Sequence, residues 1–224
     1  MSQLFVAGLW RYPVKSLAGE ALRAAEITAH GVTGDRLAHV RGPEGVRTSR
    51  RQYRMLGLAG SLGADGRPLV DGFPWDSEEA RDRVRAAAGP DAWLETSEPT
   101  DDGPQRFDIL PLLVATDGAV AAFGRDVRRL RPNILIGGVP GMEERAWEGA
   151  ELRITGSSSA HAVRIRLDSL RGRCPMTTVD PDTLARDPEV LYDIGRRFGG
   201  RLALNAAVLH GGVVEIGAQV ELLR

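Results

Sequence analysis

Residues 170–183 read LRGRCPMTTVDPDT and contain the one cysteine of this 224-residue chain. Arg171 and Arg173 flank Cys174, and Pro175 stiffens the backbone just beyond it. A cysteine thiolate is both a nucleophile and a metal ligand, and nearby cations favour it over the thiol. A lone cysteine is more often a small apolar filler of the core. Because threonines and aspartates make the segment after Cys174 polar and turn-forming, we predict a functional loop here.

The segment RCPMTTVDPDT, residues 173–183, resembles the signature of the MOSC family. This domain is found at the C-terminus of molybdenum cofactor sulfurases and in the amidoxime-reducing molybdenum enzymes, where the cysteine after the arginine is the protein ligand of molybdenum. The resemblance implies a molybdenum cofactor of the molybdopterin type, with Cys174 as metal ligand and catalytic residue. The matching residues stand at fixed offsets from the cysteine and are Thr177, Thr178, Val179, Asp180, Pro181, Asp182 and Thr183.

The composition is that of an ordinary globular protein, with 42% hydrophobic and 26% charged residues. A chain of this length can bury one large core or two small ones. The formal net charge of −1 gives no electrostatic reason to expect nucleic acid or an anionic membrane as a partner. One cysteine excludes an internal disulfide and an iron–sulfur cluster held by this chain's own thiolates. The N-terminal segment has neither a signal-peptide pattern nor a membrane-spanning apolar run, so we expect a soluble, unprocessed, cytoplasmic protein.

Residues 12–19 read YPVKSLAG and follow an alternating apolar run at residues 4–9 that predicts a strand. As a bare pattern, a lysine after a strand is usually solvated. The segment closely resembles the N-terminal motif of two-part MOSC proteins, the MOSC N-terminal β-barrel. In that motif the lysine and serine contact the phosphate or pterin of the cofactor. Its pairing with the distant cysteine motif makes Lys15 and Ser16 expected cofactor ligands.

The segment after residue 23 predicts a strand, a glycine turn and a second strand that begins at Arg36. The family binds its cofactor with the arginine of this Asp-Arg pair, although Ala38 stands where relatives often have an aromatic residue. Arg50 lies in a stretch that resembles the family's threonine–x–arginine segment. Five arginines between residues 41 and 54 would usually form a solvated rim, so Arg50 ranks after Lys15 and Arg36 as an expected ligand.

Residues 60–105 are rich in turn-forming dipeptides and contain one predicted helix. Asp76 is its expected N-cap, and Gly89 with Pro90 should end it. Its buried stripe should consist of Ala80, Val84 and Ala88. We place a boundary near residues 101–104, between an N-terminal part of residues 1–103 and a C-terminal part of residues 104–224. No long Gly/Ser/Pro tract is present, so the two parts should pack closely together.

Two further motifs open the C-terminal part. An apolar run predicts a strand that ends at Thr116 and a short helix with Asp117 as N-cap. The family places a polar pair at this helix start, facing the pterin. The sequence RPNILIG then supplies Arg131 and Asn133, to which we carry the family's cofactor-binding roles. A guanidinium offers a planar fork of donors, and an amide both donates and accepts, which suits recognition of a phosphate or a pterin ring.

Residues 147–224 carry several short alternating strands, which favour a barrel. One helix follows the cysteine loop, with Asp187 as cap and Leu191, Ile194 and Phe198 as its buried stripe. The expected fold is therefore mainly β with some helices (α+β): an N-terminal β-barrel packed on a MOSC β-barrel, with the cofactor between them. The residues expected to bind it, besides the metal ligand Cys174, are Lys15, Ser16, Arg36, Arg50, Thr116, Asp117, Arg131, Asn133, Arg173 and Asn205.

Other kinds of site find little support in the sequence. The four histidines have none of the short spacings of a zinc site, and there is no phosphate loop or dinucleotide fingerprint. A Cys–His hydrolase stays open, because its partners could meet only in space, but nothing marks a particular histidine.

The resemblance implies a molybdenum-dependent oxidoreductase that removes oxygen from a small N-hydroxylated compound. The alternative is a non-redox carrier that binds the cofactor or holds a persulfide sulfur on Cys174. A reductase of this kind needs a separate electron-donor protein, ferredoxin-like or cytochrome-b5-like, with a reductase behind it. The chain has no dinucleotide or flavin motif and too few cysteines for a cluster.

Overall fold

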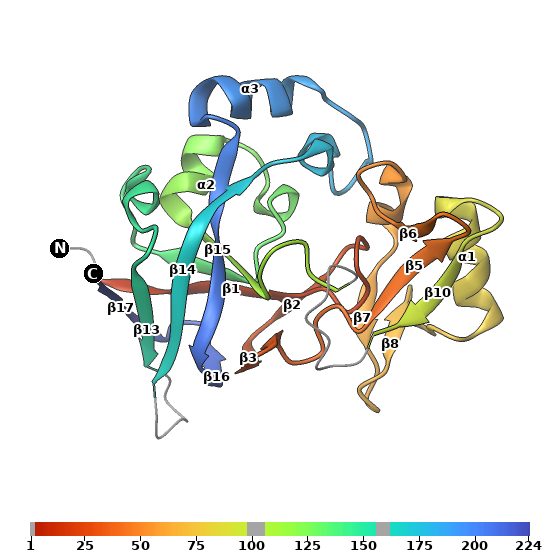
Figure 1. The fold of residues 1–224 in the computed structure, drawn as a ribbon, viewed down its shortest axis with the longest axis horizontal. Helices are drawn as coiled ribbons and strands as arrows, with labels where there is room; N and C mark the ends of the chain where they lie inside the picture. The colour runs from red at the N-terminus through yellow and green to blue at the C-terminus, as the bar shows by residue number, and fades with distance from the viewer. Residues whose placement is uncertain (1–2, 98–105, 156–161) are drawn as a thin grey trace.

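The computed structural model describes residues 3–97, 106–155 and 162–224. Two β-built parts lie side by side (Figure 1). The larger part carries the short helices α2 (Asp117–Phe123) and α3 (Glu189–Phe198) at one end, and the smaller part carries α1 (Glu78–Ala88). No helix of the described chain is long and apolar enough to cross a membrane.

The larger part is a closed barrel of seven strands. Its strands pair antiparallel except for β11 and β12, which are parallel and joined by α2. A short strand, β2 (Glu20–Leu22), extends the sheet beyond β1. In order around the barrel the strands are β12 (Ile134–Gly137), β11 (Leu112–Thr116), β15 (Arg201–His210), β14 (Val163–Gly172), β13 (Glu151–Thr155), β17 (Gln219–Leu223) and β1 (Leu4–Arg11), which pairs back with β12.

The alternation of apolar and polar residues explains how the barrel forms. Along β14, Val163, Ile165 and Leu167 are buried, whereas the arginines between them are exposed. Successive side chains of a strand point to opposite faces, so one set fills the barrel and the other meets water. Closure also removes the free edges that an open sheet would expose to other chains.

The smaller part consists of short strands around a core that includes Val40, Met55, Val70 and Val84. Helix α1 and the 3-10 helix η1 (Tyr53–Gly57) cover this core. One three-stranded sheet contains β5 (Ala38–Gly42), β6 (Gly45–Arg47) and β10 (Trp93–Thr96), and another contains β7 (Gly60–Leu62), β8 (Pro68–Val70) and β9 (Phe73–Pro74).

Strands from early in the chain also pair with strands from its end. β1 lies between β17 and β12 in the barrel, and β3 (Ala24–Thr28) pairs with both β4 (Gly31–Val32) and β16 (Gly212–Glu215). Early and late segments of the chain are thus joined by shared sheets. The predicted mainly β fold is confirmed, and the predicted boundary at residues 101–104 lies outside the described residues.

The predicted helix of the smaller part is present, and Ala80, Val84 and Ala88 form its buried stripe. Its predicted N-cap was wrong by one residue. The hydroxyl of Ser77 accepts the hydrogen bond from the backbone N–H of Ala80, at 3.2 Å. The Asp76 carboxylate instead pairs with Arg67, at 2.6 Å, because the turn between β7 and β8 presents that guanidinium to it.

Helix α3 packs on the 3-10 helix η4 (Pro175–Thr178), directly after Cys174. Pro188 takes the N-cap position of this helix, one residue after the predicted Asp187, and the Asp187 carboxylate accepts a hydrogen bond from the N–H of Glu189, at 3.1 Å. The predicted stripe needs one correction. Val190, and not Leu191, is buried with Ile194 and Phe198, because residues spaced by four fall on one helix face.

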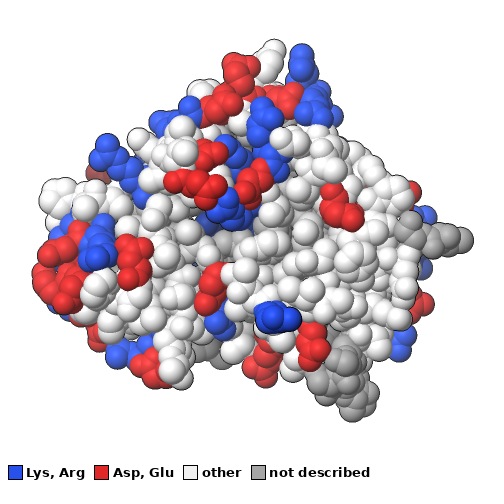
Figure 2. Space-filling model, turned by 180° about the vertical axis from the view of Figure 1, so that it is seen from behind, with Lys and Arg blue, Asp and Glu red and all other residues white. Residues whose placement is uncertain are grey.

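The back of the molecule shows how its charges are arranged (Figure 2). Lysines and arginines lie interspersed with acidic residues, mainly over the part that carries α1 and towards the end with α3, while much of the barrel surface is uncharged. This mixture agrees with the near-zero net charge. It leaves no broad single-sign patch on this face for nucleic acid.

Candidate functional site

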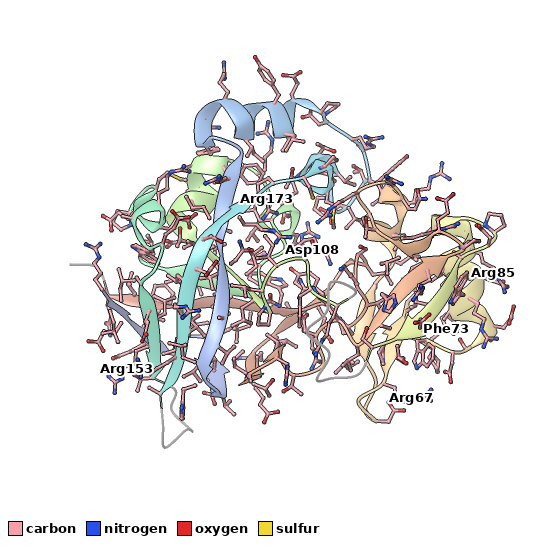
Figure 3. All side chains as sticks on the ribbon, in the orientation of Figure 1. Arg67, Phe73, Arg85, Asp108, Arg153 and Arg173 are labelled. Atoms are coloured by element: carbon pink, nitrogen blue, oxygen red, sulfur yellow. The ribbon has the colours of Figure 1, made fainter. Side chains whose placement is uncertain are left out.

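A pocket lies where the barrel meets the smaller part, and Cys174 is half-buried in its wall. Figure 3 shows two other residues of this pocket, Arg173 and Asp108, in the middle of the molecule. The pocket brings together segments that are up to 190 positions apart in the sequence, from Lys15 to Asn205. Eight of the predicted site residues line it, namely Lys15, Ser16, Arg36, Arg50, Arg131, Arg173, Cys174 and Asn205.

The cysteine loop is held in shape by its own threonines. The carbonyl oxygen of Cys174 accepts hydrogen bonds from the N–H of Thr177, at 3.1 Å, and from its hydroxyl, at 2.9 Å. The hydroxyl of Thr178 donates to the carbonyl of Pro175, at 2.7 Å. These bonds close the turn η4 and fix the backbone on which the sulfur is carried.

Asp180 anchors the other end of the motif. Its carboxylate accepts hydrogen bonds from the N–H groups of Thr183 and Asp182, and it pairs with the Arg129 guanidinium at 2.8 Å. These hydrogen bonds lower the pKa of Asp180 to about 2, and the bond from the backbone N–H of Thr183 has the largest effect. The fixed offsets of the motif therefore describe a turn held by hydrogen bonds at both ends, and this turn carries Cys174.

Three pocket residues have an unusual backbone conformation. Six non-glycine residues of the described chain have positive φ, and Ser16 (73°), Arg36 (52°) and Arg131 (57°) are three of them. This conformation costs energy for an L-residue and tends to cluster at functional sites. It also corrects one prediction, because Arg36 lies in a turn before β5 and does not begin the strand.

Hydrogen bonds hold the Lys15–Ser16 turn in place. The N–H of Lys15 donates to the carbonyl of Ala38, at 2.8 Å, and the buried hydroxyl of Ser49 donates to the carbonyl of Ser16. Both residues are therefore fixed from the smaller part of the molecule while their side chains line the pocket.

Aromatic rings separate the arginines. The guanidinium of Arg131 lies 4.2 Å from the centre of the Tyr12 ring, and Arg36 lies 5.6 Å from the same ring and 5.7 Å from that of Phe107. Burial raises the pKa of Tyr12 to about 12, and the neutral hydroxyl donates to the carbonyl of Pro132 at 3.0 Å. Stacking on a neutral ring lets like-charged groups lie close together.

Nothing in the sequence indicates Asp108 as a pocket residue, and the sequence indicates Arg171 only as a cation beside Cys174 and not as an expected ligand. The Asp108 carboxylate lies 3.2 Å from Lys15 Nζ, 2.7 Å from Arg50 Nη2 and 2.8 Å from Arg171 Nη2. Burial raises the pKa of Asp108, but the three cations outweigh it and hold the pKa below its ordinary value. In the sequence, this aspartate is one polar residue inside an apolar run, which gives no local signal.

The cations around the pocket outnumber its acids. Six cationic side chains line it, against the one carboxylate of Asp108, and they are Lys15, Arg36, Arg50, Arg131, Arg171 and Arg173. Burial lowers the pKa of Lys15 below its ordinary value and that of Arg173 to about 10. The guanidinium of Arg173 donates to the carbonyl of Leu130 at 2.7 Å, but its buried Nε has no hydrogen-bond partner among the described residues. Such a set of donors suits an anionic ligand.

Arg50 connects the cationic group to the sulfur. Burial opposes its charge, yet the carboxylate of Asp108 and the side chain of Cys174 raise the pKa of Arg50 above its ordinary value. Its guanidinium therefore remains a permanent positive charge beside Cys174.

Three predicted ligands do not line this pocket. Asp117 accepts hydrogen bonds from the N–H groups of Gly138, at 2.7 Å, and Val139, at 3.0 Å. Asn133 accepts from the N–H of Leu113, at 3.1 Å. Thr116 is the N-cap of α2, which corrects the prediction that Asp117 has this role.

The hydroxyl of Thr116 donates to the carboxylate of Glu144, at 2.6 Å. Glu144 belongs to the 3-10 helix η3 (Glu143–Ala146), is fully buried and also accepts from the N–H of Ala203 at 3.2 Å. Burial raises the pKa of Glu144, because these hydrogen bonds only partly offset the loss of hydration.

The raised pKa of Glu144 predicts a pH dependence of stability. The stabilisation that the protonated Glu144 carboxyl gives the folded state is fully present below the pKa of an unfolded glutamate, about 4.3. It is lost as the pH rises through the folded-state pKa. Glu144→Gln removes the titrating group, so the unfolding free energy of this variant should decline less than that of the wild type as the pH rises from about 4 through the folded-state pKa of Glu144. Urea unfolding at several pH values measures this difference. Glu143→Gln, at the exposed neighbour, is the control, and identical pH profiles for all three proteins would contradict the prediction.

The alternative sites find no support among the described residues. No group of three His, Cys, Asp or Glu residues in that part of the chain could hold a metal ion. No histidine lines the pocket around Cys174, which argues against a Cys–His hydrolase there. His161 lies outside the described residues.

Comparison with known proteins identifies the family to which the chain is related. The model of the MOSC N-terminal beta barrel domain matches residues 3–71, and that of the MOSC domain matches residues 118–221. The crystal structure of the YUAD protein from Bacillus subtilis is similar over 99% of this chain and 98% of that chain, with 12% identity and a TM-score of 0.52. A hypothetical protein of known structure is similar over 100% of this chain and 70% of its own, with 11% identity and a TM-score of 0.50. At these identities the likeness shows the fold alone, and no curated protein matches the sequence.

Proposed function

This chain belongs to the family of two-part proteins that join a MOSC N-terminal beta barrel domain to a MOSC domain, and we propose that it is a molybdenum-cofactor-dependent oxidoreductase. MOSC domains occur in enzymes that bind the molybdenum cofactor. The proposed reaction is the reduction of N-hydroxylated compounds by removal of their oxygen. The observation that carries the proposal is the position of Cys174 in a pocket lined by six cations.

The residues of the pocket fit the chemistry of this cofactor. A cysteine sulfur is a suitable ligand for a soft metal site. The cations provide hydrogen bonds and charge for an anionic pterin, and the unpartnered buried Nε of Arg173 offers one further donor. We assign the metal to Cys174. We assign the pterin and its phosphate to Lys15, Ser16, Arg36, Arg50, Arg131, Arg173 and Asn205.

The other three predicted ligands support the pocket indirectly. The amide of Asn133 lies 3.3 Å from the carboxylate of Asp35, which also accepts from Arg36 and from the N–H of Tyr12. Thr116 and Asp117 hold the start of α2 against Glu144 and the segment after β12. Their substitution should therefore affect cofactor binding through the fold.

The cofactor would supply the two-electron chemistry, and the protein would supply binding and orientation. The substrate gains two electrons and two protons, its N–O bond breaks, and the products are the N–H compound and water. Apolar side chains of Leu110, Leu113 and Met176 line the pocket beside the cations. They would hold the organic part of a small substrate next to Cys174 and keep bulk water away.

The protein should not turn over with NADH alone, because its sequence contains no dinucleotide fingerprint and no recognisable flavin motif. We propose that a ferredoxin-like or cytochrome-b5-like protein docks transiently near the pocket in the cytoplasm, as is usual for electron transfer. The test is benzamidoxime reduction with NADH alone, then with a ferredoxin and its reductase, then with a chemical reductant. We expect turnover in the last two assays, and reduction with NADH alone would overturn the prediction.

Molybdenum analysis of the same sample separates this function from the alternative. A protein that contains molybdenum and fails with every donor would be a cofactor carrier. The half-buried sulfur of Cys174 beside Arg50 would also suit a persulfide, which mass spectrometry of the purified protein would detect as one additional sulfur atom.

A further inference from the structure

Three of the six pocket cations meet at one carboxylate. Lys15, Arg50 and Arg171 come from three distant segments of the chain, and each pairs with Asp108 within 3.2 Å. These contacts use the same donors that would bind an anionic group of a ligand. A carboxylate and a phosphate cannot occupy one place, because like charges repel strongly when they are partly removed from water.

The environment of Asp108 differs from that of a structural carboxylate. Asp35, close by, is fully buried and accepts from the backbone N–H of Tyr12 and from the amide of Asn133. The Asp108 side chain is 31% exposed, and its ion-pair partners are all cationic side chains of the pocket. These three ion pairs involve no backbone N–H group. Neutralising Asp108 would therefore break contacts with side chains and would leave no backbone donor of these ion pairs without its acceptor.

The cations have other contacts that hold them in place. Arg171 also donates to the side-chain oxygen of Asn205, at 3.3 Å, and the backbone of Lys15 is fixed to Ala38. Arg50 lies beside Cys174. The three cations should therefore keep their positions when Asp108 leaves.

The segment that carries Asp108 can change without disturbing the core. Residues 108–111 have no regular secondary structure. Arg106 and Phe107 are buried just before them, and β11 starts just after them at Leu112. A shift of Asp108 would be confined to this short exposed stretch between two fixed ends.

We propose that Asp108 is an internal counterion that neutralises Lys15, Arg50 and Arg171 and is displaced when an anionic group of the ligand, a phosphate monoester in chemical class, binds to the same three cations. Asp108 thereby lowers the affinity of the pocket for anions and makes the ligand exchangeable. This inference rests on the proposed function only for the identity of the ligand.

The test is calorimetric titration of the full chain, prepared without cofactor, with inorganic phosphate at constant ionic strength. Asp108→Asn should bind phosphate at least about tenfold more tightly than the wild type, because the competing charge is gone. Asp76→Asn is the matched control, since it removes the same charge from an exposed ion pair with Arg67, outside the pocket. Its affinity should equal that of the wild type. In the Asp108→Asn background, Lys15→Met should reverse the gain.

The sign of the effect decides the role of Asp108. Weaker or unchanged phosphate binding in Asp108→Asn would overturn the proposal, because a residue that only positions the cations cannot improve binding when it is removed. Asp108→Ser, which is also neutral, provides the same measurement if the asparagine variant does not fold. A gain in phosphate affinity in a protein that never contains molybdenum would support this inference and reject the proposed function, so the two can fail separately.

Discussion

Replacement of Cys174 by alanine is expected to abolish molybdenum-dependent reduction and to leave the fold intact. Substitution of a residue that merely hydrogen-bonds to a metal ligand typically lowers metal affinity or activity roughly 10- to 100-fold. Loss of the ligand itself should therefore lower the rate by about 100-fold or more. The stability should change by less than about 1 kcal/mol, because the side chain is half-buried in a loop and outside the barrel core. Benzamidoxime reduction with a chemical reductant, molybdenum analysis and thermal unfolding measure the three quantities.

Cys174→Ser provides the discriminating control for this experiment. Serine is similar in size and hydrogen bonding but is a poorer ligand for a soft metal site, so its activity should be nearly as low as that of alanine. If the sulfur only filled space, serine would restore most of the activity. Wild-type activity in both variants would remove Cys174 from the mechanism.

Arg131→Ala should cause the largest loss of cofactor among the variants of the pocket cations. Removal of a guanidinium fork from a buried anion costs roughly 2–5 kcal/mol, because it leaves the anion without its partner. Arg131 also stacks on the Tyr12 ring, where burial lowers the pKa of the guanidinium and Arg36 acts in the same direction. The molybdenum content of the purified protein measures the effect. Lys15→Ala and Arg36→Ala should lower it less.

Two further variants show whether shape or charge matters at Arg131. Arg131→Lys keeps the charge without the planar fork, and it should restore little of the cofactor content if bidentate binding is essential. Arg153→Ala is the control for loss of an arginine, since Arg153 pairs with Glu221 on the barrel surface, away from the pocket (Figure 3). An unchanged molybdenum content in Arg131→Ala would identify this arginine as a structural residue.

Features set by neighbouring residues could be predicted from the sequence. The cysteine turn is closed by Thr177 and Thr178, whose partners are three residues away, so their offsets alone describe the structure. The alternation in β14 and the four-residue spacing of α1 likewise indicate which faces are buried. Errors at this level were shifts of one position, as at the caps of α1 and α2, because adjacent polar residues compete for the same backbone donors.

The resemblance to a family predicted which distant residues belong to one site. It linked Lys15, Arg36 and Arg131 to Cys174 although no periodicity connects them, and the structure brings all four into one pocket. It did not predict the strained turns at Ser16, Arg36 and Arg131, because a positive φ at a residue other than glycine depends on the surrounding fold.

Only the tertiary structure decided which charges meet. Asp108 and its partners Lys15, Arg50 and Arg171 are separated by between 58 and 93 positions, and they meet because β1 closes the barrel against β12 and the smaller part packs beside it. Asp117, equally polar and next to a strand end, turns instead to the backbone of Gly138 and Val139. The sequence by itself determined the turns, the helices and the buried faces, since these depend on near neighbours. The counterion of the pocket depends on packing between distant segments, and no local pattern encodes it.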